Sequence, residues 1–381
     1  MPTFAVAAIV IASIAAMPGN VLPVMAGLLS DFHSLDEVEV GFLIATGTLT
    51  GLLISLSAPQ WIARVDCRYA IAIALVVDAI GLFGLRFAPG PVTLFAAQAL
   101  AGGSSAIIAS ICLTVVASLP NPTRAYSIKI TTDVVFAGTF LALMPAATLG
   151  LGGYVAALAG ISAVVVPLAS RLPLRAIRAV HTDGAPIRLR DAPRSAWLML
   201  LAIMVFYVGG IGVWAFLERV AVHAGIERVA ASNAIAVGLF VGVVGSLGAA
   251  VLAGRTKRIW PETLAGLVLV ASFAMLTFVN GTVQFYFAVF VFNCSWNFFI
   301  PFVIGLVANR DSTGRLSSLV PATVMIGGVL GPVLTGAMIR ASGYRSAMIV
   351  MTLIVATSIT GYILIASKPL RVHATPALEG G

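Results

Sequence analysis

The chain has 381 residues, of which 60% are hydrophobic and only 9% are charged, and its mean hydropathy is +1.06. Soluble domains average about 45–50% apolar and about 25% charged residues, and disordered chains have low hydrophobicity, so both classes are excluded. The three cysteines exclude a disulfide framework, and neither they nor the four histidines show the spacing of a metal site. We therefore expect a polytopic membrane protein with no metal and no cofactor.

Apolar stretches of about 20 residues, long enough to cross the hydrocarbon of a bilayer, occur twelve times along the chain. They are continuous runs, which favours helices over the alternating strands of a membrane barrel. The first stretch lacks a basic start and runs past the length of a signal peptide, so we expect an uncleaved helix. The sequence thus predicts an all-α fold with spans at approximately 4–29, 39–62, 69–88, 92–119, 126–149, 151–169, 197–221, 230–254, 262–280, 282–308, 315–340 and 344–367.

The basic residues fall unequally on the two sides of these spans. Of the 22 Lys and Arg residues, 17 lie on the side of both termini and 5 on the opposite side, where the loop from Asp31 to Glu39 carries four acids. The positive-inside rule then places both termini in the cytoplasm, with the chain in the inner membrane. The net charge of +8 is explained by this topology and by contact with anionic lipid. No basic soluble module is present, so we expect no nucleic-acid partner.

The two halves of the chain repeat. Residues 171–196 contain six of the arginines and three prolines and separate spans six and seven. Arg64 and Arg255 follow the second span of each half, Arg124 and Arg315 follow the fourth, and both pairs are 191 residues apart. A parallel repeat of six helices is a known transporter architecture, with the substrate site between the halves.

On these features the chain resembles the major facilitator superfamily. The resemblance implies two pseudo-symmetric six-helix bundles at residues 1–170 and 197–367, a cytoplasmic linker at 171–196 and a cytoplasmic tail at 368–381. It also implies that spans one, four, seven and ten line a central cavity, and we expect a monomer. Of the family's charged loop motif after span two only Arg68 is matched here, and Arg64, Asp66 and Arg68 offer a different set of charges in its place. We assign these residues, with Arg124, Arg255 and Arg315, as candidates for gating at the cytoplasmic loops.

Three acids fall at membrane depth, where a charge costs about 2.5–3.5 kcal/mol on insertion scales, so each is a candidate for proton coupling. Asp133 in span five has Lys129 four residues before it, which allows either a protonation site or a structural ion pair. Asp78 in span three is either such a site or a hydrogen-bonded acid inside the bundle. Glu218 in span seven precedes Arg219 and suits either an interfacial pair or a gate.

Polar and aromatic residues form stripes on the spans that the resemblance places at the cavity. In span seven the stripe contains Tyr207 and Trp214, and in span ten it contains Tyr286, Asn293, Trp296 and Asn297. Asn20, beside a predicted break in span one, and Gln98, where related proton-coupled proteins carry Arg, complete the candidate substrate-binding set. Helix–helix contact remains the alternative for the amides, because such groups commonly join membrane helices.

These features favour a secondary active transporter of a small organic solute, amphipathic or aromatic, driven by protons and directed toward efflux. No nucleotide-binding motif is present, and the histidines do not cluster, so we expect neither ATP drive nor an enzyme. The alternatives are a facilitative uniporter and a non-transporting membrane sensor built on a transporter scaffold.

Overall fold

The structure is a computed structural model of the whole chain, and it describes residues 1–120, 122–144, 146–175, 194–252, 260–310 and 319–367. Apart from a short 3-10 helix, η1 (Val166–Arg171), the elements within these ranges are α-helices. Their bounds are α1 (Thr3–Asn20), α2 (Leu22–His33), α3 (Glu37–Trp61), α4 (Cys67–Phe87), α5 (Pro91–Ala117), α6 (Pro122–Leu143), α7 (Ala146–Val164), α8 (Arg194–His223), α9 (Arg228–Leu252), α10 (Trp260–Thr277), α11 (Thr282–Arg310) and α12 (Val320–Ala366).

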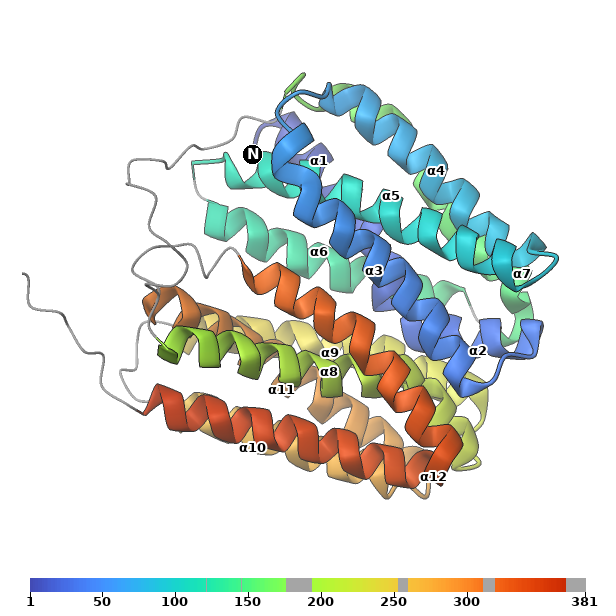
Figure 1. Ribbon diagram of the computed structural model, residues 1–381, viewed down its shortest axis with the longest axis vertical. Helices are drawn as coiled ribbons and strands as arrows, with labels where there is room; N and C mark the ends of the chain where they lie inside the picture. Colours follow the sequence, from blue (N-terminus) through green and yellow to red (C-terminus); the bar gives the residue numbers. More distant parts are fainter. Residues whose placement is uncertain (121, 145, 176–193, 253–259, 311–318, 368–381) are drawn as a thin grey trace, which may run out of the picture.

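Eleven of the described helices are long and apolar enough to cross a membrane. One of them, α12, has 47 residues, and as a straight helix it would be about 70 Å long at 1.5 Å per residue, more than twice the thickness of the hydrocarbon. Gly343 interrupts it with a φ of 82°, and the two parts fold back beside each other (Figure 1). Dividing α12 at Gly343 gives twelve spans, so the predicted all-α polytopic fold is confirmed.

The first span is broken, as the sequence predicts near Asn20. Helix α1 ends at Asn20 and α2 begins at Leu22, one residue before Pro23. Proline has no N–H, so Pro23 cannot donate to the carbonyl of Gly19 four residues earlier. That carbonyl instead accepts a hydrogen bond from Trp214 Nε1 on α8, at 3.1 Å. The break therefore creates an acceptor at membrane depth that a helix from the other half of the chain satisfies.

Helices α1–α7 lie in one group and α8–α12 in another (Figure 1). Between the groups, α3 packs against α12, α6 against α9, and α2 against α8. We refer to α1–α7 with η1 as the first half and to α8–α12 as the second half.

Helices α3 and α12 come closest at the end where α3 begins. A Cβ on Gly336 would lie 2.1 Å from the Glu37 carbonyl oxygen, and one on Gly41 would lie 2.5 Å from that of Pro332. Toward the other end of α3, the nearest atom of α12 to a Cβ on Gly51 would be the tip of the Met325 side chain, at 3.5 Å. The glycines of span eleven thus allow backbone-to-backbone contact, and the two helices diverge away from it.

Candidate functional site

A cavity of about 320 Å³ lies inside the first half, between α1, α3, α5 and α6, and reaches Met325 of α12. Alanine, glycine and leucine side chains form most of its wall, and its polar groups include Thr48, Gln98, Ser105 and Lys129. Such a wall, apolar with a few polar groups, is typical of a site for a small organic ligand.

Gln98, one of the candidate substrate-binding residues, therefore lines this cavity. A Cβ on Gly47 would lie 2.7 Å from its Nε2, so the glycine on α3 makes room for the amide. Its Oε1 is shielded from solvent and accepts no hydrogen bond within the described part of the chain. This oxygen is an acceptor that a ligand in the cavity could satisfy.

An ion pair forms part of the cavity wall. Lys129 Nζ lies 2.6 Å from Asp133 Oδ2, and the two side chains are 15% and 12% exposed. Both residues are on α6, four positions apart, and Asp133 also lies beside Ser13 of α1. The Lys129 side chain lines the cavity, whereas the Asp133 side chain is buried and does not line it. A change in the charge of Asp133 would alter the lysine that borders the cavity.

The second half contributes an aromatic cluster that contains three of the candidate substrate-binding residues. The ring of Trp296 on α11 stacks on Phe206 at 4.7 Å, and Tyr207 meets Trp296 edge-on at 5.5 Å. Trp214 lies 6.0 Å from Phe292, which in turn lies 5.7 Å from Trp296. Tyr207, Trp214 and Trp296 thus lie in one chain of ring contacts between α8 and α11.

The remaining candidates are placed differently. Asn20 donates to the Ala16 carbonyl on its own helix, and Tyr286 pairs with the ring of Phe290.

Asn293 donates to the Val289 carbonyl at 3.0 Å, and Asn297 donates to the Asn293 carbonyl at 2.9 Å. The two asparagines face α9, where a Cβ on Gly238 or Gly242 would meet their amide nitrogens at 2.9 and 2.6 Å.

Asp78 lies in a second polar cluster. Among the described residues, no basic side chain lies within hydrogen-bond distance of its carboxyl group. It is fully buried and accepts hydrogen bonds from Ser104 at 3.3 Å, Ser105 at 2.9 Å and Ser162 at 2.8 Å. The donors come from α5 and α7, so the carboxyl group joins α4 to two neighbouring helices. Ser105 also lines the cavity, which brings this cluster next to it.

Polar side chains join the two halves at the end where α3 begins, and we call this set the latch. Arg219 Nη2 lies 2.7 Å from Asp31 Oδ1, Arg340 Nη1 lies 3.0 Å from Asp36 Oδ2, and the Tyr344 hydroxyl donates to Glu37 Oε1 at 2.8 Å. Arg228 also pairs with Asp31. The latch residues are Asp31, Asp36 and Glu37 of the first half and Arg219, Arg228, Arg340 and Tyr344 of the second half.

Glu218 lies directly behind the latch. Its side chain is fully buried, and its Oε1 accepts from Arg228 Nε at 2.6 Å. A Cβ on Gly27 of α2 would lie 2.3 Å from its Oε2, so the carboxylate reaches the first half. Arg228 therefore bridges one exposed acid, Asp31, and one buried acid, Glu218.

The sequence points to Glu218 but does not by itself predict the latch as a whole. A signal for it was present, because the loop from Asp31 to Glu39 is acidic and the few arginines on the same side of the membrane include Arg219, Arg228 and Arg340. When one half carries acids and the other half carries arginines on the same side of the membrane, this pattern indicates a contact between the halves.

The candidate loop residues lie at the opposite end. Asp66 caps α4 by accepting from the Arg68 backbone N–H at 2.9 Å, and Arg68 Nε donates to the Leu172 carbonyl at 2.7 Å. Arg64 and Arg124 are exposed. Arg255 and Arg315 lie outside the described residues. Within the described residues no three His, Cys, Asp or Glu side chains are grouped so that they could hold a metal ion.

No family model and no curated protein matches the chain. Solved structures do resemble it. A bacterial homologue of the human lysosomal transporter Spinster, in an inward-facing and occupied conformation, aligns with a TM-score of 0.73 at 16% identity over 98% of each chain. A variant of the nucleoside transporter NupG aligns with a TM-score of 0.77 at 12% identity, over 95% of this chain and 99% of that one. The chain therefore has a fold of the major facilitator type, as its sequence predicts.

Proposed function

We propose that this chain is a secondary active transporter that carries a small organic solute across a membrane by alternating access, coupled to protons. One observation carries the proposal. The first half contains a cavity at membrane depth, and the latch joins the first and second halves at one end of the molecule. The fold it shares with solved transporters supports the same conclusion: sites in such folds lie between the halves, and this cavity of the first half opens toward the second half as far as Met325.

The latch supplies the gate in this proposal. Its polar contacts link the two halves at one end, and opening that end requires them to separate. The divergence of α3 and α12 toward the other end supports a rocking movement of two bundles, residues 1–170 and 197–367, about their contact. With both termini in the cytoplasm, as the charge distribution predicts, the latch faces outward and the structure has its outer end closed.

The pair of Lys129 and Asp133 supplies the coupling. A proton on Asp133 removes its negative charge and leaves Lys129 without a counter-ion at the cavity wall. The affinity of the cavity for the solute then changes, so proton binding and solute binding are linked. In a facilitative uniporter, the alternative, the same pair would be structural and a pH gradient would not drive flux.

The lining of the cavity indicates the class of solute. Its apolar wall and the single amide of Gln98 suit a small amphipathic molecule. The aromatic cluster at Tyr207, Trp214 and Trp296 lies outside this lining and is connected to it by the hydrogen bond from Trp214 to the Gly19 carbonyl; we infer the preference for a ring from this cluster. Nucleosides, which the name of one structural neighbour suggests, combine both features. We favour efflux, because neither surface adds a charge beyond Lys129.

Flux in reconstituted liposomes tests this function. Purified protein is reconstituted with a pH gradient, and radiolabelled amphipathic and aromatic solutes, nucleosides included, are screened for movement against their own gradient. We expect at least one solute to accumulate, and a protonophore to abolish its accumulation. Flux that only equilibrates would support the uniporter, and conformational change without flux of any solute would support the sensor.

A further inference from the structure

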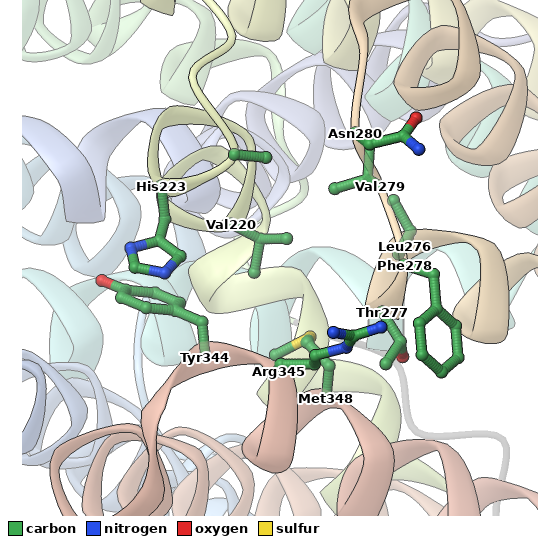
Figure 2. Close-up of a pocket in the computed structure, with 11 residues that line it drawn as sticks. Val220, His223, Leu276, Thr277, Phe278, Val279, Asn280, Tyr344, Arg345 and Met348 are labelled. Atoms are coloured by element: carbon green, nitrogen blue, oxygen red, sulfur yellow. The ribbon is translucent and has the colours of Figure 1, made fainter.

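A second cavity, of about 310 Å³, lies in the second half next to the latch (Figure 2). It is bounded by the end of α8, the connection from α10 to α11, and the start of the second part of α12. Its wall includes Val220, His223, Leu276, Asn280, Tyr344 and Arg345. None of these residues belongs to the cavity in the first half, so the two cavities are separate.

Contacts within the described residues hold the walls of this cavity in place. The rings of His223 and Tyr344 stack at 4.6 Å, and the Arg345 guanidinium lies 4.6 Å from the centre of the Phe278 ring. Gln284 fixes the connection from α10 to α11 by donating to the Phe278 carbonyl at 3.2 Å and accepting from the Asn280 N–H at 3.3 Å. The cavity is thus formed before any ligand enters, which lowers the cost of binding.

Arg345 differs from the other second-half arginines at this end. Arg219, Arg228 and Arg340 each pair with a carboxylate, whereas Arg345 forms no ion pair within the described residues. Figure 2 shows the Arg345 side chain between the Tyr344 and Phe278 rings. A guanidinium held against a ring and facing a cavity is a fitting partner for a carboxylate.

The geometry points to a binding site for a small organic carboxylate in this cavity, coupled to the latch. The carboxylate pairs with Arg345, and His223 offers a further hydrogen-bonding group. The apolar part of the ligand lies against Val220 and Leu276. This apolar wall favours an organic acid over an inorganic anion, because binding removes apolar surface of both the acid and the wall from contact with water.

Tyr344 connects the site to the latch. Its ring lines the cavity and stacks on His223, while its hydroxyl donates to Glu37 of the first half. A ligand that packs on this stack keeps Tyr344 in the position that reaches Glu37. Binding therefore favours the latched arrangement, and by linkage latching favours binding. An organic acid in this cavity would act as an inhibitor of opening, without entering the transport cavity.

Binding of benzoate to the purified full-length protein tests the proposal, with benzamide as its uncharged isostere and inorganic phosphate as the anion without an apolar part. By isothermal titration calorimetry, we expect benzoate to bind at least tenfold more tightly than benzamide or phosphate. Arg345→Gln should weaken benzoate binding at least tenfold. Arg86→Gln is the matched control, since Arg86 also lies over a ring, that of Phe32, and does not line the cavity. It should leave binding unchanged.

A second variant keeps the test decisive if Arg345→Gln fails to fold. Ala224→Trp places a large ring in the cavity without changing charge, and it too should abolish benzoate binding. Absence of benzoate binding to the wild type would overturn the proposal, as would equal binding to Arg345→Gln or Ala224→Trp. Phosphate binding as tightly as benzoate would overturn the assignment to an organic acid. These measurements need no transport, so their outcome is independent of the proposed transport function.

Discussion

Asp133 and Asp78 are both buried carboxyl groups in the first half, yet their surroundings differ. Asp133 has one charged partner, Lys129, on its own helix and at the wall of the cavity. Asp78 has three hydroxyl donors on two other helices and no charged partner among its hydrogen bonds. An ion pair responds to the loss of one charge, whereas hydroxyl groups can serve a carboxyl group in either protonation state.

This contrast separates two roles for acids that the sequence presents alike. The donors to Asp78 tie α4 to α5 and α7, so its loss should loosen the first half. The partner of Asp133 is four residues away on α6, so its loss should leave the helix packing intact and change the charge at the cavity. We therefore expect substitutions at Asp78 to act on stability and substitutions at Asp133 to act on coupling.

The largest expected effect is that of Lys129→Ala. It leaves Asp133 buried without a counter-charge, and breaking a buried pair on one side costs about 3–5 kcal/mol of unfolding free energy. Thermal unfolding in detergent measures the loss. The double variant Lys129→Ala with Asp133→Asn should recover most of it. A single variant as stable as the wild type would mean that Asp133 is not charged in the folded protein.

Asp78→Ala should follow in size. It leaves the hydroxyls of Ser105 and Ser162 without their acceptor, at a cost of about 1–3 kcal/mol for an unsatisfied buried group, whereas Ser104 keeps the Leu100 carbonyl at 2.7 Å. The same unfolding assay measures it, and Ser105→Ala, which removes one donor, should cost less. Equal stability of Asp78→Ala and the wild type would contradict the structural role.

Asp133→Asn should reduce proton-driven accumulation at least tenfold, equivalent to about 1.4 kcal/mol in the driving step, while solute exchange continues. The amide keeps the size of the side chain but cannot carry a proton across. Accumulation and counterflow in the same liposomes separate the two activities. The matched control is Asp78→Asn, whose accumulation per folded molecule should stay near that of the wild type. If Asp133→Asn accumulated solute normally, Glu218 or Asp78 would be the better coupling candidate.

The smallest expected effect is that of Arg340→Gln. This latch arginine is 65% exposed, and an exposed pair contributes only about 0.2–1 kcal/mol. Arg228→Gln should have a larger effect, because it leaves Glu218 buried without its partner. Unfolding temperatures of both variants, measured side by side, test this order. A larger loss for Arg340→Gln would show that the exposed pairs, and not Glu218, hold the latch.

The fold could be predicted from the sequence because each span is encoded locally by a continuous apolar run, and the break beside Asn20 by the nearby Gly19 and Pro23. The latch could not, because its partners lie far apart in the chain, as with Glu37 and Tyr344. Charge counts place acids and arginines on one side of the membrane but do not say which meet. The helical stripes likewise identify Asn293 and Trp296 without showing that the former faces α9 and the latter Phe206.

Distances across the latch test alternating access most directly. Spin labels are placed at two strongly exposed positions on either side of it, Val92 on α5 and Val283 on α11, in a background with Cys294 replaced by Ala. A second pair, Tyr69 on α4 and Trp260 on α10, reports on the opposite end. With a transported solute and a change of pH, double electron–electron resonance should show the first distance lengthening as the second shortens. Active transport with both distances unchanged would contradict the account.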